Sequence, residues 1–165
     1  MKNLLLIWLL LWFGVGIATN VRANTDKILV NRTLDALHHN ASVANFKAYF
    51  SLYHGNAIFI GTDASEVWDK ETFKAYAKPH FDKGTGWTYH PRDRHIYFSP
   101  DRNVAWFDEL LDNKSLGETR GTGVLIKVSD DWKLTQYHLA IPIPNSLADS
   151  VAEQIKTMDN EKAPL

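Results

Sequence analysis

The stretch from Arg120 to Asn145, RGTGVLIKVSDDWKLTQYHLAIPIPN, constrains the fold more than any other part of the sequence. Polar and apolar residues alternate on both sides of Ser129-Asp130-Asp131, which predicts a β-hairpin with its turn at those three residues. Side chains alternate across a strand, so the even positions should share one face of this hairpin. Near the turn the face holds Val124, Ile126, Val128, Trp132 and Leu134, and its far end holds Arg120, Thr122, Gln136, His138 and Ala140. One face is therefore apolar at the turn and polar away from it.

The rest of the chain adds helices first and strands afterwards. Helical spacing of apolar residues predicts helices over 26–37, 43–50 and 70–81, the second capped by Ser42 and the third by Asp69. Alternation and turn residues predict strands over 53–62, 87–89 continuing into 95–99, 104–111, 118–128 and 132–143, with a closing helix over 147–158. Helices grouped before an antiparallel meander predict an α+β fold. A long, strongly curved, mainly antiparallel sheet wrapped around about three helices makes a cone with a packed closed end and a hollow open end.

The first 23 residues have the pattern of a secretory signal peptide. Lys2 precedes an apolar stretch from Leu4 to Val15, and small residues lead to Val21-Arg22-Ala23, where we expect cleavage. A membrane anchor is the less favoured alternative, because the apolar stretch is shorter than the ~20 residues that span a bilayer. The sequence thus predicts a domain over 24–158, a loose polar tail over 159–165, and a periplasmic or secreted protein with no membrane partner after cleavage.

Charge and cysteine content exclude several partners and chemistries. Loss of residues 1–23 would leave 16 basic against 19 acidic residues, which gives no electrostatic reason to bind nucleic acid or an anionic membrane. The chain has no cysteine, which excludes disulfides, thiol chemistry and cysteine zinc sites. The pairs His38-His39 and His90/His95 lack a standard metal-ligand spacing, and no phosphate loop, nucleotide fingerprint or G-x-S-x-G motif is present. We therefore expect neither a metal nor a cofactor.

Three segments resemble the nuclear transport factor 2-like superfamily and, within it, the SnoaL-like group. They are GTDASEVW (Gly61–Trp68), VAWFDE (Val104–Glu109) and RGTGVLIKVSDDWKLTQYHL (Arg120–Leu139), and the resemblance extends over roughly residues 25–145. It implies a cone-shaped sheet whose concave face meets the helices at one end and lines a pocket at the other. The polar end of the hairpin face would then line that pocket. Members of the superfamily also often dimerise through the outer face of the sheet.

This geometry makes the polar end of the hairpin a candidate site for a small molecule. Its predicted ligand-binding residues are Trp87, Tyr89, Trp106, Arg120, Thr122, Gln136 and His138. Arg120 needs an anionic partner if it lies away from water, and the neighbouring strand offers Asp108 or Glu109. We assign Asp108, because it shares parity with Trp106. An Arg–carboxylate pair that only braces the structure, and a His138 that is only hydrogen-bonded, are the structural alternatives.

Two other groups of residues carry predictions. Asp63 and Glu66 follow the first strand, where they either line the rim of the pocket or cap the loop through backbone N–H groups, the role we favour for Asp63. On the odd face of the hairpin, Tyr137, Leu139 and Ile141 are too apolar for full exposure, which predicts a homodimer through that outer face.

Three functions fit these predictions. The first, which we favour, is binding of a small, partly apolar molecule without turnover, because nothing in the sequence demonstrates reactivity. The second is a cofactor-free isomerase or lyase in which His138 and Asp108 exchange protons while Arg120 stabilises developing negative charge. The third is an oligomerisation domain without a ligand, although the chain has no attached catalytic domain to organise.

Overall fold

A computed structural model of the protein describes residues 24–162, which contain helices and a six-stranded sheet. Residues 24–42 are helical and are called the N-terminal helix below. The elements that follow are α2 (Phe46–Ser51), β1 (Tyr53–Ile60), β2 (Val67–Asp69), α3 (Lys70–Asp82), β3 (His90–Phe98), β4 (Val104–Asn113), β5 (Gly117–Val128), β6 (Asp131–Ala140), η1 (Asn145–Leu147) and α4 (Ala148–Lys162). The predicted signal peptide, residues 1–23, lies outside the described residues.

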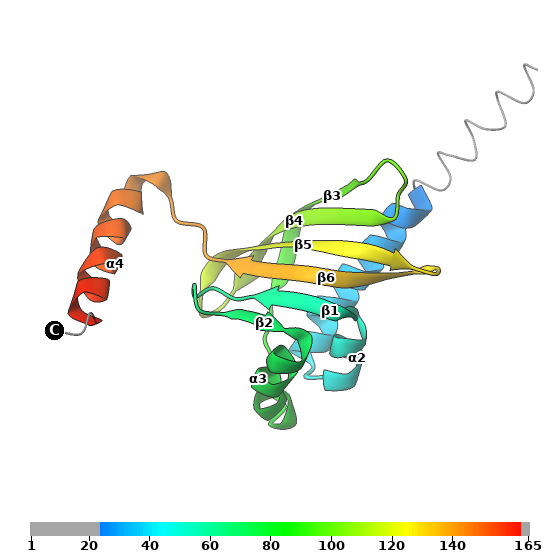
Figure 1. The fold of residues 1–165 in the computed structure, drawn as a ribbon, viewed down its shortest axis with the longest axis horizontal. Helices are drawn as coiled ribbons and strands as arrows, with labels where there is room; N and C mark the ends of the chain where they lie inside the picture. Colours follow the sequence, from blue (N-terminus) through cyan, green and yellow to red (C-terminus); the bar gives the residue numbers. More distant parts are fainter. Residues whose placement is uncertain (1–23, 163–165) are drawn as a thin grey trace, which may run out of the picture.

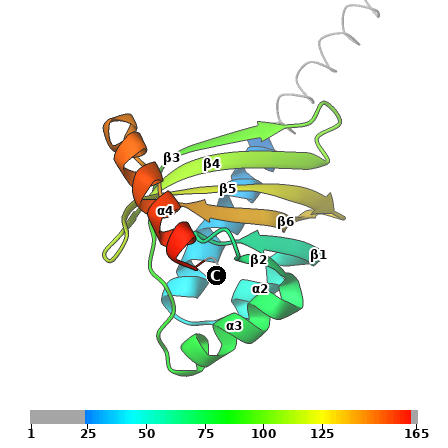
Figure 2. The same cartoon turned by 60° about the vertical axis from the view of Figure 1, so that its left-hand side comes forward.

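The strands form one mixed sheet in the order β2-β1-β6-β5-β4-β3, and every neighbouring pair is antiparallel except β1 and β6. The N-terminal helix, α2 and α3 lie on one side of this curved sheet (Figures 1 and 2). The predicted α+β class with a mainly antiparallel sheet is confirmed. The sheet curves around the helices without closing, and the short strand β2 at its edge was not predicted.

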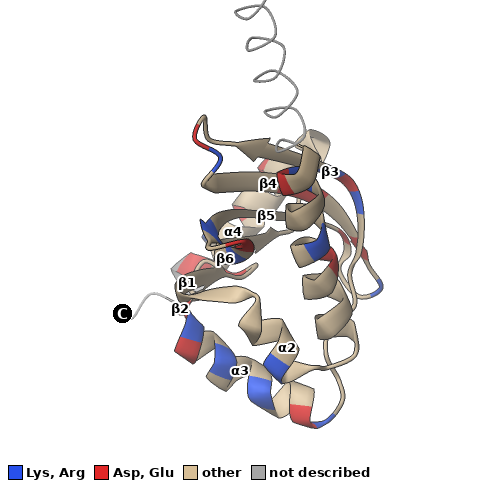
Figure 3. Cartoon of the chain, turned by 90° about the vertical axis from the view of Figure 1, so that its right-hand side faces the viewer, with Lys and Arg blue, Asp and Glu red and all other residues tan. Residues whose placement is uncertain are grey.

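Helix α3 shows how the local sequence sets an element and its buried face. Asp69 caps the helix as predicted, because its side chain accepts a hydrogen bond from Thr72 N at 2.7 Å. Phe73, Ala77 and Phe81 recur at four-residue spacing and are buried, whereas charged residues of both signs lie along the helix (Figure 3). The helix continues past Pro79 rather than ending there.

The core lies between the sheet and the helices packed against it. Fully buried side chains come from the N-terminal helix, from α3 and from the central strands, and include Val30, Leu34, Phe73, Leu111, Leu125 and Leu134. Aromatic rings of α2 and β1 join them: Tyr49, Phe50 and Tyr53 are all buried. Helix α2 begins after Asn45, whose side chain accepts from Ala48 N at 3.2 Å, and not after the predicted cap Ser42.

The predicted core face of the hairpin is wrong for all of β5 and for the outer half of β6. In β5 the odd positions are buried, and in β6 burial passes from even to odd positions beyond Leu134. The register explains the reversal: Leu125 pairs with Leu134 but Val124 pairs with Gln136, so Thr135 is an extra residue in β6. Such a β-bulge turns every later side chain to the opposite face.

The C-terminal helix stands apart from the domain. Helix α4 follows directly on η1 and lies away from the sheet, and a segment without regular structure joins η1 to β6 (Figure 1). It runs to Lys162, so the chain is still helical where a loose tail from Asp159 was expected. Within residues 24–162, no helix is both long and apolar enough to cross a membrane.

Candidate functional site

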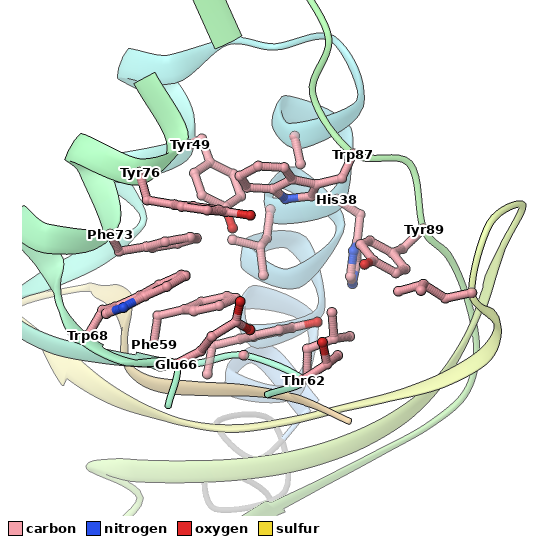
Figure 4. Close-up of a pocket in the computed structure, with 16 residues that line it drawn as sticks. His38, Tyr49, Phe59, Thr62, Glu66, Trp68, Phe73, Tyr76, Trp87 and Tyr89 are labelled. Carbon is pink, nitrogen blue, oxygen red and sulfur yellow. The ribbon is translucent and has the colours of Figure 1, made fainter. Parts of the chain in front are cut away.

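A cavity of about 200 Å³ opens on the concave side of the sheet (Figure 4). A cavity of about 150 Å³ is large enough for benzene, so this one fits a single ring with a short substituent. Its lining combines the N-terminal helix, α2, α3, the segment before β3 and strands at one end of the sheet. The lining residues are Leu37, His38, Ala41, Tyr49, Phe59, Gly61, Thr62, Glu66, Trp68, Phe73, Tyr76, Trp87, Tyr89, Leu116, Tyr137 and Leu139.

Near-parallel aromatic rings form one wall of the cavity. The ring centroids of Phe59 and Phe73 are 3.8 Å apart with an interplanar angle of 14°. Phe59 also stacks with Tyr137 (5.9 Å, 11°), and Trp68 stacks with Phe73 (6.0 Å, 18°). Trp87 lies on the opposite side of the space (Figure 4). A flat apolar wall of this kind favours a flat apolar ligand, because such a ligand can pack one of its faces against the rings.

A buried chain of hydrogen-bonded groups reaches the cavity at His38. His38 Nε2 lies 2.6 Å from Glu109 Oε1, and Arg94 Nε donates to Glu109 Oε2 at 2.6 Å. Burial alone would lower the pKa of Arg94, but the charge of Glu109 and the contacts with Asp35 outweigh burial and raise that pKa. Arg94 therefore stays charged and compensates the fully buried Glu109. His38 lines the cavity, and its other ring nitrogen, Nδ1, has no hydrogen-bond partner among the described residues.

Two more polar groups line the cavity. Burial, followed by the negative charge of Glu109, raises the pKa of the Tyr137 hydroxyl well above its ordinary value, so this group stays neutral and can donate a hydrogen bond. That hydroxyl has no hydrogen-bond partner within residues 24–162. Glu66 is half-buried, and its carboxylate accepts one long hydrogen bond, from Asp63 N at 3.3 Å. In the described part of the chain, no three His, Asp or Glu side chains are grouped to hold a metal ion.

The structure divides the predicted site residues into two sets. Trp87 and Tyr89 line the cavity. The others lie on the outer face of the sheet: Trp106, Asp108, Arg120, Thr122, Gln136 and His138. The prediction that they point into one cavity with Trp87 and Tyr89 is wrong, because β5 buries its odd positions and the bulge reverses β6. Asp108 lies 3.1 Å from His95 Nδ1 and does not pair with Arg120.

The same reversal moves other residues into the cavity. Tyr137 and Leu139, expected on the outer face, are 5% and 8% exposed and line the cavity. Of the two acids after β1, Asp63 caps its own loop by accepting from Ser65 N at 2.9 Å, whereas Glu66 lines the cavity. Ile141 follows β6 and is exposed.

Sequence reasoning missed His38 and chose the wrong acid of β4. A signal for Glu109 was present, because it shares parity with Ala105, Phe107 and Leu111, which make an apolar inner face. His38 offered no local signal. It meets Glu109 across 71 residues of sequence, and only the packing of the N-terminal helix on the sheet brings the two together.

Several solved structures share this fold, an open, curved sheet with helices on its concave side, and some of them are described as NTF2-like. A candidate dehydratase of the NTF2-like family from Streptomyces avermitilis has a TM-score of 0.64 at 15% identity, covering 74% of this chain and 99% of that one. A candidate scytalone dehydratase from Novosphingobium aromaticivorans has a TM-score of 0.62 at 11% identity, covering 73% and 87%. An NTF2-like protein of unknown function from Pseudomonas putida has a TM-score of 0.60 at 9% identity, covering 70% and 86%.

The chain belongs to the SnoaL-like domain family, whose family model matches residues 30–144. No curated protein matches the sequence. At identities this low, the solved structures establish the shared fold and not a shared chemistry.

Proposed function

We propose that this SnoaL-like domain binds a small, largely apolar molecule with a flat ring in the cavity between the N-terminal helix, α3 and the sheet. The observation that carries the proposal is the set of near-parallel rings around that space. The groups with hydrogen-bonding capacity at its edge, His38, Glu66 and Tyr137, would orient the molecule. If residues 1–23 export the protein, as the sequence predicts, the protein would bind this ligand in the periplasm or outside the cell.

Tryptophan variants test this function. We expect 4-methylphenol, a neutral probe with a single ring, to bind the wild type in isothermal titration calorimetry. Trp68→Ala should weaken that binding by about tenfold or more, because the probe loses one of its ring contacts. Trp106→Ala is the matched control, since it removes the same side chain from the outer face. Absence of binding to the wild type, or an equal loss in both variants, would contradict the proposal.

Proton transfer at His38 is the second candidate function, and the His38–Glu109 hydrogen bond favours it. A carboxylate that accepts the Nε2–H of a histidine leaves Nδ1 as the base, an arrangement that suits general acid–base catalysis. In this candidate function, His38 takes the place of the predicted proton-transfer pair, His138 and Asp108, which lie on the outer face. The reaction would still be a cofactor-free isomerisation or elimination.

Exchange of hydrogen with solvent tests the second candidate. A molecule that co-purifies with the wild type, detected by native mass spectrometry, should exchange a carbon-bound hydrogen for deuterium in D₂O. His38→Gln should keep the molecule bound and lose the exchange, because the amide cannot accept the proton. Exchange that continues in this variant would exclude His38 as the base and leave binding as the function.

A further inference from the structure

The single acid and the rings that line the cavity indicate the charge of its ligand. We propose that the cavity takes a ligand carrying a positively charged ammonium group, held by the Glu66 carboxylate and by the faces of neighbouring aromatic rings. This inference rests on the proposed function, because it names the chemical class of the molecule bound in the same cavity.

Glu66 reaches the cavity because Gly61 leaves room for it. A Cβ atom on Gly61 would overlap Glu66 Oε2 and would lie 2.8 Å from Glu66 Cδ, so the Glu66 side chain fills the space beside the glycine. The backbone fixes this arrangement, since Gly61 N donates to Glu66 O at 2.9 Å. The carboxylate is thereby directed into the cavity beside Phe59 (Figure 4).

The charge of Glu66 has no cationic partner within residues 24–162. Its carboxylate accepts the long hydrogen bond from Asp63 N and forms no ion pair. None of the 16 residues that line the cavity is Lys or Arg. Glu109 differs, because Arg94 compensates its charge. A partly enclosed carboxylate without a counter-ion favours a ligand that brings one.

Aromatic faces beside Glu66 strengthen the preference for a cation. Trp68 lies close to two other rings, with its centroid 6.0 Å from that of Phe59 and 4.6 Å from that of Tyr76. The face of an aromatic ring attracts cations electrostatically, and an ammonium group over such faces binds more strongly where water is partly excluded. An anionic ligand would instead meet the uncompensated charge of Glu66. Rings and carboxylate together therefore select a cation.

A charged probe and its neutral isostere test the inference. Benzyltrimethylammonium and neopentylbenzene have the same shape and differ in charge, and quenching of tryptophan fluorescence measures the binding of each. We expect the wild type to bind the cation about tenfold more tightly than the neutral probe. Glu66→Gln keeps the size of the side chain and an oxygen for the Asp63 N–H, so it should bring the two affinities to within about threefold by weakening the cation alone.

Two further variants complete the experiment. Gly61→Ala should also remove the preference, because the added methyl group displaces the Glu66 carboxylate. Glu71→Gln removes an equal charge from α3, outside the cavity, and should keep the preference. Equal binding of both probes to the wild type, or an unchanged preference in Glu66→Gln, would overturn the inference and leave the proposed function standing. If neither probe binds the wild type, the proposed function fails and the inference fails with it.

Discussion

Asp26 and Glu109 are the buried carboxylates of the described chain, with 1% and 0% of their surface exposed. Each one is paired with a cation. Asp26 accepts from Arg102 Nε at 2.9 Å and from Lys127 Nζ at 2.8 Å, and Glu109 accepts from Arg94. A buried charge that loses its partner destabilises the fold. Asp26 therefore fixes the N-terminal helix to the β3–β4 turn and to β5, whereas Glu109 supports the cavity wall.

Asp26→Asn should lower the free energy of unfolding by about 2 kcal/mol at neutral pH, because both cations lose their counter-charge. Burial alone would raise the pKa of Asp26, but the hydrogen bonds and charges of Lys127 and Arg102 outweigh burial and lower it below its unfolded value of 3.8. A carboxyl group of this kind stabilises the fold above its unfolded pKa. That contribution disappears as the pH falls through the folded pKa.

Urea unfolding at pH 7 and at pH 3 measures both effects. The difference in stability between the wild type and Asp26→Asn should shrink at pH 3. Asp82→Asn, which breaks an exposed pair with Lys78, should leave stability unchanged at pH 7. A loss of the same size at both pH values would assign the effect to packing rather than to charge.

At the scale of whole elements, the sequence identified most helices and strands but not their faces. Turn residues and the Asp69 cap are local signals, and they place α3 and the strands close to their observed bounds. The inner face of β5 was hidden because Gly121 and Gly123 occupy it. Other side chains fill the space in front of these glycines, and a Cβ on Gly123 would lie 2.8 Å from Phe107 Cε1.

The candidate site was predictable only in part for the same reason. Trp87 and Tyr89 could be assigned to the cavity because they belong to a short aromatic segment before β3. The β6 residues could not, because a bulge at Thr135 leaves no mark in the alternation of single residues. Their assignment depended on a register that only the pairing with β5 reveals.

Deletion of Thr135 tests the importance of this bulge. Without the extra residue, Leu134 and Gln136 become neighbours in a regular strand, so Tyr137 and Leu139 stay inward and Gln136 and His138 stay outward. We expect the free energy of unfolding to change by no more than about 1 kcal/mol, because no buried apolar side chain is exposed. Deletion of Tyr137 instead would turn His138 inward and Leu139 outward, and should lower the free energy of unfolding by about 3 kcal/mol or more. Chemical denaturation compares the two deletions, and equal losses of stability would show that the faces of β6 do not depend on this residue count.

On the scale of the whole molecule, the outer face of the sheet carries an uncovered apolar surface. Tyr97 and Trp106 stack at 6.0 Å and are 48% and 44% exposed. The register extends their row through Val124 and Gln136 to Ile58, which is 42% exposed. Exposed apolar residues gathered on one face in this way often mark a site of interaction between proteins.

We propose that a second copy of the chain covers this face in a homodimer. The sequence predicted a homodimer through Tyr137 and Leu139, but these residues line the cavity. The proposed interface is instead formed by the exposed residues Tyr97, Trp106 and Ile58. Two copies related by a two-fold axis would bring the same row together on both sides, which lets one patch cover itself. Burial of these rings from water supplies the driving force.

Trp106→Lys tests the dimer. Sedimentation velocity at tens of micromolar, roughly the range of ordinary dimer affinities, should show a dimer for the wild type and a monomer for the variant, while circular dichroism remains that of the folded protein. The lysine places a charge at the centre of the patch, where two copies would bring two such charges together. Val43→Lys is the control, because it adds the same charge at an exposed apolar position away from the sheet. A wild type that already sediments as a monomer would exclude the dimer, and a dimer that persists in Trp106→Lys would place the interface elsewhere.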